Sequence, residues 1–263
     1  MLKGVTIGQY VPGESPVHNL DPRTKLLVSL VLVVSIFMIQ TLPGFLPVAA
    51  LVLFSALLSR IPLRLIFRGL KPIFWLLLIT WLLHAFTDPG RVLYALGPLK
   101  VTYEGVVEGL TVVVRLALLM FGTTLVTLTT SPVALTDGLE YLLGPLKRFG
   151  LPVGELAMMM TIALRFIPTL LDEAERIMKA QMARGADFTT GSLTRRVRAM
   201  IPLLVPLFIS SFQRADELAI AMEARAYRGG EGRTRLHELK MRPIDWVVLA
   251  SGSSFFVWLG IVF

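Results

Sequence analysis

Two arginines stand at matched positions in two similar stretches of the sequence, 173–185 and 214–226. When Arg184 is aligned with Arg225, 41 residues further on, alanine, acidic and aliphatic residues recur at the same places before each arginine. An arginine carries a fixed fork of donors that suits carboxylates and the carbonyl groups at helix ends. The alanines beside it leave room for another backbone to come close. The repeat therefore indicates two similar docking points on one chain.

Both stretches are typical of helix ends. A spacing of three and four residues places the repeated positions on one helix face. We expect the first helix to run to Arg184, with Gly185 as its C-terminal cap, and the second to run to about Arg225. An arginine in a last helical turn also complements the helix dipole, by about 0.3–1 kcal/mol, without any partner. The sequence leaves this purely local role open beside the docking role.

The remainder of the chain is strongly apolar. Its 263 residues are 54% hydrophobic and have a mean hydropathy of +0.70. Long apolar runs of this kind are typical of membrane proteins. They predict an all-α integral membrane protein with about five transmembrane helices, at residues 26–41, 43–59, 72–87, 106–129 and 244–263.

A basic region is inserted before the last expected span, which divides the chain into 1–130, 131–243 and 244–263. The segment 131–243 predicts a coupling domain of about three helices. Its first helix is expected to begin at Ser131-Pro132 and to continue to Phe149, with leucines at helical spacing. The two longer helices that follow carry the arginines.

The distribution of Lys and Arg predicts the orientation in the cell membrane. The segment 130–243 holds 16 of the 26 basic residues, whereas the loop between the third and fourth spans holds only Arg91 and Lys100. The positive-inside rule then places the N-terminus and the coupling domain in the cytoplasm and the C-terminus outside. Two apolar runs, 156–171 and 200–212, could instead form a membrane hairpin. That alternative would carry Arg184 outside, so we favour helices that pack at the membrane surface or dip partly into it.

Further candidate residues lie at or within the expected spans. Asp21 and Pro22 are typical of a helix start, and with Arg23 and Lys25 they precede the first span, in either a structural role or a partner contact. Arg115 lies inside the fourth span, where a charge is a functional candidate by default. Its nearest acidic residue on the same face is two turns away, so we expect another helix to supply its partner.

Several functions are disfavoured by what the sequence lacks. It has no cysteine and only three scattered histidines, so we expect no metal site and no cofactor. It has no phosphate-binding Gly-x-x-x-x-Gly-Lys-Ser/Thr motif, so the chain itself is not expected to bind ATP. A polytopic membrane enzyme would need clustered polar catalytic residues, and a secondary carrier would show inverted repeats. The basic residues fit membrane topology and do not indicate nucleic-acid binding.

With these residues in place, the chain resembles the transmembrane T component of energy-coupling factor transporters, a branch of the ABC importers for vitamins and trace metals. The resemblance covers essentially the whole chain. It rests first on two short Ala-Arg-Gly-type motifs, Ala183-Arg184-Gly185 and Ala224-Arg225-Ala226. The pattern before the first span, Asp21-Pro22-Arg23-Thr24-Lys25, also matches. Pro168 with the run 173–184, and the order of spans and helices, agree as well. Ala226 departs from the glycine that is usual in the family.

The resemblance implies a coupling role without catalysis by this chain. Two cytoplasmic ATPase subunits, alike or different, would each receive one arginine-tipped helix, at Arg184 and Arg225. A membrane-embedded substrate-binding S component would contact apolar residues, for which we name Met158, Met159, Met160, Leu139 and Leu142. The methionines could equally fill an ordinary core. A shared module for several vitamins and a dedicated cobalt, nickel or biotin importer both remain open.

Overall fold

The computed structural model describes residues 10–96, 99–186, 188, 192–227, 229 and 240–262. They fall into two units. The larger unit holds the described residues up to Leu142 together with 240–262, and the smaller unit holds the described residues from Leu143 to 229.

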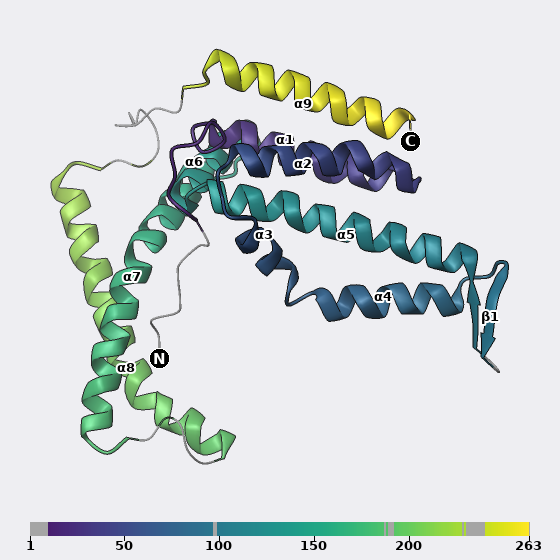
Figure 1. Cartoon of the computed structure of the whole chain (residues 1–263). Helices are drawn as coiled ribbons and strands as arrows, with labels where there is room; N and C mark the ends of the chain where they lie inside the picture. Colours follow the sequence, from purple (N-terminus) through teal and green to yellow (C-terminus); the bar gives the residue numbers. More distant parts are fainter. Residues whose placement is uncertain are drawn as a thin grey trace. The chain divides into compact units, whose positions relative to one another are not determined.

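The larger unit contains a helix at each of the five expected spans. Its helices are α1 (Pro22–Met38), α2 (Phe45–Leu58), α3 (Leu63–Leu70), α4 (Phe74–Thr87), α5 (Tyr103–Thr129), α6 (Pro132–Leu142) and α9 (Pro243–Val262), with a single 3₁₀ turn, η1 (Leu42–Gly44), before α2. α1 packs against α9, α5 and α6, and α2 packs against α5. These long helices run side by side in Figure 1. The all-α prediction is therefore supported, whereas five crossings of the membrane remain a prediction.

An apolar core holds α1, α2, α5 and α9 together. Aliphatic and aromatic side chains from each helix bury one another there, and the most fully buried are Ile36, Ile39, Phe45, Val48, Phe256 and Leu259. α4 packs on α5 at very close range. A Cβ on Gly105 of α5 would collide with the backbone carbonyl oxygen of His84 in α4. Glycine is required there because no side chain fits between the two backbones.

Two features of the larger unit were not predicted. The expected span 72–87 is α4 alone, and it is preceded by the short helix α3, from which it is bent by 57°. The expected loop after it contains an antiparallel hairpin of β1 (Val92–Leu96) and β2 (Leu99–Thr102). The hairpin projects beyond the ends of α4 and α5 (Figure 1).

The smaller unit consists of a 3₁₀ helix, η2 (Gly144–Phe149), and two long helices, α7 (Val153–Ala183) and α8 (Leu193–Ala224). The prediction of one helix from Ser131 to Phe149 is wrong in its second half. α6 ends at Leu142, because Pro145 lacks an N–H group and disfavours helical geometry in the residue before it. The predicted start is confirmed, since the Ser131 hydroxyl accepts the N–H of Ala134 at 3.2 Å.

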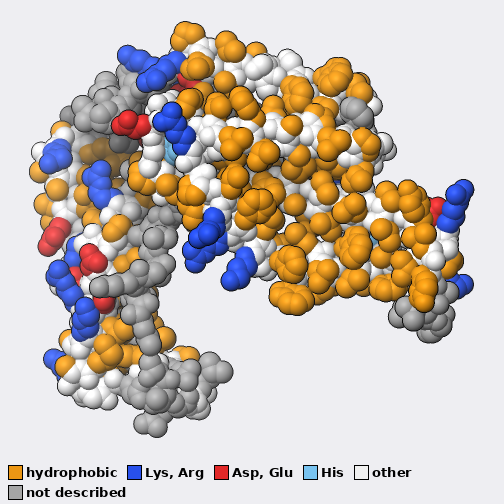
Figure 2. All heavy atoms as spheres, in the orientation of Figure 1, with side chains coloured by type: hydrophobic (Ala, Val, Ile, Leu, Met, Phe, Trp, Pro, Cys, Tyr) orange, Lys and Arg blue, Asp and Glu red, His pale blue; other side chains and the backbone are white. Residues whose placement is uncertain are grey.

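Length and composition allow two of the described helices to cross a bilayer by themselves, α5 and α7, and a third if the bent pair of α3 and α4 is one span. α7 therefore meets the criterion for a span, although the positions of the basic residues favour the membrane surface. Its placement remains a prediction. Figure 2 shows hydrophobic side chains covering most of the visible face of the larger unit, as expected for a surface that meets lipid or other apolar partners.

Candidate functional site

The two arginine-tipped helices end in the same hydrogen-bond pattern. At the end of α7, the N–H of Gly185 donates to Met182 O at 3.0 Å and the N–H of Ala186 donates to Gln181 O at 3.0 Å. At the end of α8, Ala226 N–H donates to Glu223 O at 2.8 Å and Tyr227 N–H to Met222 O at 3.0 Å. Both are Schellman motifs, in which the helix is closed by a residue in the left-handed conformation.

The residue after each arginine adopts that left-handed conformation. Gly185 has φ 86° and Ala226 has φ 56°. The departure from glycine at position 226 therefore leaves the cap geometry unchanged. It places an alanine where a Cβ is strained, because it approaches the neighbouring carbonyl oxygen.

Both arginines are presented to the outside of the unit. Arg184 and Arg225 are each the C-cap residue of their helix, and both are exposed. Within the described residues, neither side chain makes a hydrogen bond or an ion pair. The alanines next to them, Ala183 and Ala224, are also exposed and leave the space around each guanidinium open. These five-donor groups are therefore available to acceptors on another molecule.

An ion pair joins α7 and α8 at equivalent positions of the repeat. Arg214 Nη2 of α8 lies 2.9 Å from Glu173 Oε2 of α7, and the two residues are 41 positions apart, the same offset that relates the two arginines. The two copies of the repeat therefore contact each other at equivalent positions, and we call this contact the crossing point. Ala174, which follows Glu173 in α7, is buried.

The crossing point sets the positions of both arginines. Arg184 follows Glu173 by 11 residues, and Arg225 follows Arg214 by 11 residues. At 1.5 Å per residue, each arginine lies about 16 Å along its helix from the crossing. Figure 1 shows the C-terminal ends of α7 and α8 on opposite sides of the crossing. The unit thus presents two helix ends with the same hydrogen-bond pattern at separated points.

The residues before the first span form a buried polar cluster. Asp21 caps α1 by accepting the N–H of Arg23 at 2.9 Å, and Pro22 occupies the first helical turn. The Lys25 ammonium donates to the carbonyl oxygens of His18, at 3.1 Å, and Thr129, at 3.0 Å. The Arg23 guanidinium stacks 3.5 Å above the ring of Tyr141 in α6. Asp21, Pro22, Arg23 and Lys25 are all buried. Their contacts join the start of α1 to the ends of α5 and α6.

Asp245 belongs to the same cluster and was missed by the sequence analysis. Its carboxylate accepts the backbone N–H of Asp21 at 2.8 Å and that of Arg242 at 2.8 Å, and the residue is only 1% exposed. It ties the beginning of α9 to the beginning of α1. The one local signal was an acidic residue just after Pro243, a typical position in the first turn of a helix.

Arg115 has the partner from another element that its place in α5 predicted. Its Nη2 donates to the carbonyl oxygen of Ile39, the C-cap residue of α1, at 2.8 Å. Its guanidinium also lies 5.9 Å from the centre of the Phe45 ring at the start of α2. The charge satisfies a helix C-terminus inside an apolar core, where a carbonyl would otherwise lack a donor.

The residues expected to face an apolar partner are largely uncovered. Met159 is 57% exposed and Met160 is 46% exposed, with Met158 half-buried, on α7. On α6 of the other unit, Leu139 is exposed and Leu142 is half-buried. Met159 and Met160 are thus not core residues of the smaller unit. Among the described residues there is no group of three or more His, Cys, Asp or Glu side chains placed to hold a metal ion.

The chain is similar to known proteins over most of its length. The cobalt transport protein family (CbiQ) matches residues 13–236. The energy-coupling factor transporter transmembrane protein EcfT of Thermosediminibacter oceani is 52% identical over 265 residues, which cover 98% of this chain and 100% of that protein. EcfT proteins of Heliobacterium modesticaldum (52% over 257 residues, 98% and 97% covered) and Bacillus subtilis (49% over 252 residues, 95% of each covered) are similarly related.

The apolar helices and these relatives define the class of protein as a membrane component of a transporter. Within that class, the chain belongs to the cobalt transport protein (CbiQ) family and to its energy-coupling factor transporter transmembrane proteins. The resemblance inferred from the two arginine motifs is confirmed at the level of the family.

Proposed function

We propose that this chain is the coupling subunit of an energy-coupling factor ABC importer. It links ATP hydrolysis by two cytoplasmic ATPase subunits to uptake of a vitamin through a membrane-embedded S component. The chain itself is non-catalytic in this proposal, and ATP is hydrolysed by the partner subunits.

The observation that carries the proposal is the pair of matched helix ends. Arg184 and Arg225 end their helices in the same hydrogen-bond pattern, are exposed and lack an intramolecular partner among the described residues. An ATPase dimer has two equivalent surfaces, so a two-fold repeat offers each of them the same contact. Ala183 and Gly185 in one motif, and Ala224 and Ala226 in the other, leave space for a groove wall around each arginine.

The Glu173–Arg214 pair supplies a path for motion between the two ends. Because α7 and α8 are pinned to each other near the crossing, a movement that brings the two ATPase subunits together would turn the helices about that point. The apolar stretches before the crossing would pass the movement to the S component. Contacts with that component are assigned to Met158, Met159 and Met160 on α7 and to Leu139 and Leu142 on α6.

The orientation in the membrane follows the distribution of charge. The basic coupling region 131–243 and the N-terminus lie in the cytoplasm, where the ATPase subunits reside, and the C-terminus lies outside. The buried cluster around Asp21, Arg23 and Lys25, and the Arg115 contact with α1, hold the membrane helices on which the coupling helices act.

The first test is retention of ATPase subunits by the detergent-solubilised chain after co-expression. Wild type should retain two ATPase chains, and a variant carrying both Arg184→Glu and Arg225→Glu should lose them while eluting as a folded protein in size exclusion. The control variant Arg91→Glu/Lys100→Glu, at exposed positions before β1 and within β2, changes the net charge by the same four units and should retain both. If wild type retains no ATPase, the coupling proposal is wrong, and the arginines serve only their own helix ends.

The cargo class requires a separate measurement. The family is described as cobalt transport proteins, whereas the named relatives are energy-coupling factor proteins. Uptake of radiolabelled cobalt and of labelled vitamins should be compared in cells that contain the full complex. Uptake of several vitamins, each with its own S component, supports a shared module. Uptake of cobalt, nickel or biotin alone indicates a dedicated importer.

A further inference from the structure

The short helix α3 has an apolar face and a basic face. Leu63, Ile66 and Phe67 lie on one side at helical spacing, and Arg64 and Arg68 lie four residues apart on the other side. Ile66 is buried, whereas both arginines are exposed. A strongly amphipathic helix next to membrane helices is typical of the interface between lipid and water.

The basic face of α3 has no acidic counterpart nearby in the chain. Arg60 and Lys71, at the two ends of α3, extend the basic row, and both are exposed. From residue 22 to residue 87 the sequence contains no Asp or Glu. Within the described residues, these four side chains form no ion pair. Lys and Arg side chains gather at the place of α3 in Figure 2.

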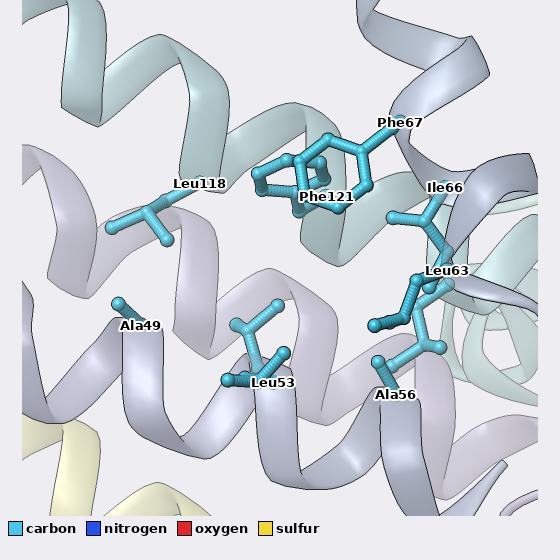
Figure 3. Close-up of a pocket in the computed structure, with 10 residues that line it drawn as sticks. Ala49, Leu53, Ala56, Leu63, Ile66, Phe67, Leu118 and Phe121 are labelled. Atoms are coloured by element: carbon cyan, nitrogen blue, oxygen red, sulfur yellow. The ribbon is translucent and has the colours of Figure 1, made fainter.

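An apolar groove of about 210 Å³ opens beside this basic row. Its walls come from α2, α3 and α5 of the larger unit (Figure 3). Its floor is buried, at Val52, Ala56, Ile66, Leu118 and Leu125, and its rim is exposed, at Leu53 and Phe67. The Phe67 ring packs edge-on against the Phe121 ring at a centroid distance of 5.3 Å. All ten residues that line the groove are apolar.

We infer that this groove binds an acyl chain of an anionic phospholipid, whose headgroup is held by the basic row of α3. Around the helix, Arg64 and Lys71 lie next to Phe67, so the basic row borders the exposed rim of the groove. The charge favours a phosphate-bearing ligand, since each Lys or Arg near a membrane surface strengthens binding to anionic lipid. The apolar groove favours a lipid over a free phosphate ion, which would leave those walls uncovered. Anionic phospholipids are components of the bilayer that surrounds a membrane protein.

The test is lipid retention by the full-length chain in nanodiscs that contain equal amounts of phosphatidylglycerol and phosphatidylcholine. After detergent extraction, native mass spectrometry should show wild type carrying phosphatidylglycerol in clear excess. The double variant Arg64→Gln/Arg68→Gln should reduce bound phosphatidylglycerol roughly tenfold. Arg91→Gln/Lys100→Gln in the exposed hairpin removes the same charge elsewhere and should leave it unchanged.

A second pair of variants tests the groove itself. Ala49→Phe would fill the groove, and Ala50→Phe adds the same side chain at the adjacent exposed position, which does not line it. Only Ala49→Phe should lower bound phosphatidylglycerol. Addition of soluble glycerol phosphate should not compete with the lipid, because it lacks an acyl chain. Equal retention of the two lipids by wild type, or equal retention by the two phenylalanine variants, would overturn the inference. Competition by glycerol phosphate would show that the basic row binds the phosphate group alone, and it would overturn the proposed role of the groove.

Discussion

The basic residues that the sequence singled out occupy two opposite environments. Arg184 and Arg225 end their helices in the open, without a hydrogen bond among the described residues. Lys25 is buried and bonded to backbone carbonyls, and Arg115 donates to the end of α1 inside the apolar core. A buried cation must be satisfied within its own chain, whereas an exposed one is available to a partner. Lys25 and Arg115 therefore have structural contacts within the chain, whereas Arg184 and Arg225 are the pair that we propose for partner binding.

Reversal of the exposed arginines should have the largest effect on partner binding. Removing one charged contact at a buried interface costs about 2–5 kcal/mol. We expect Arg184→Glu and Arg225→Glu each to weaken binding of the ATPase dimer, and the double variant to weaken it more than either, since two linked contacts reinforce each other. Titration of purified ATPase onto the immobilised chain measures this. Unchanged affinity in both single variants would remove the arginines from the interface.

A substitution in the buried cluster should lower the stability of the protein and leave partner binding unchanged. Asp245 is 1% exposed, and Asp245→Ala leaves the buried N–H of Asp21 and the part-buried N–H of Arg242 without an acceptor. We expect a loss of about 2–4 kcal/mol in stability, because each unsatisfied buried donor costs about 1–3 kcal/mol. Thermal unfolding in detergent measures this loss. Below the unfolding transition the variant should still retain its ATPase partners, and loss of the partners from a folded variant would contradict the division between the two groups.

The ion pair at the crossing tests whether the two exposed ends act together. Glu173→Arg places two guanidinium groups against each other and should cost about 1 kcal/mol in stability, since the pair is partly exposed. Docking of the ATPases should persist, because Arg184 and Arg225 remain, whereas ATP-driven uptake should fall. The exchanged pair Glu173→Arg/Arg214→Glu should recover uptake.

The control for that exchange is Glu175→Arg on the same helix. It breaks the partly exposed 3.2 Å pair with Lys179, which lies within α7 and does not reach α8. Uptake should be unaffected. If Glu175→Arg lowers uptake as much as Glu173→Arg, the effect belongs to α7 alone and the crossing contact has no special role.

The sequence predicted those parts of the site that depend on local chemistry. Gly185 after Arg184 indicated a helix end, and Asp21-Pro22 indicated a helix start, and both are found. The sequence contained no local signal for the contacts between distant segments. Asp245 lies 224 residues from Asp21, and nothing near either residue indicated their pairing. The hairpin 92–102 was missed because its short apolar strands have no periodicity that distinguishes them from a loop between spans.

The difference between the two helix ends themselves should be the smallest effect. Ala226 holds φ 56°, where glycine is favoured over alanine by about 1 kcal/mol, while Gly185 meets the same demand without strain. Apart from the two adjacent residues, a Cβ at position 185 would have no atom within 4 Å, so the cost of a substitution there is in the local backbone alone. We therefore expect Ala226→Gly to stabilise the end of α8 and Gly185→Ala to destabilise the end of α7, each by about 1 kcal/mol.

Amide hydrogen exchange at the two caps measures these opposite changes directly. Tyr227 N–H, which donates to Met222 O, should exchange more slowly in Ala226→Gly. Ala186 N–H, which donates to Gln181 O, should exchange faster in Gly185→Ala. Each amide also serves as the control for the variant at the other end. If protection falls in both variants, the αL strain at Ala226 is relieved by some other contact, and the two ends are less alike than their hydrogen bonds indicate. If the signs are opposite, the end of α8 carries a backbone strain at Ala226 that the end of α7 lacks.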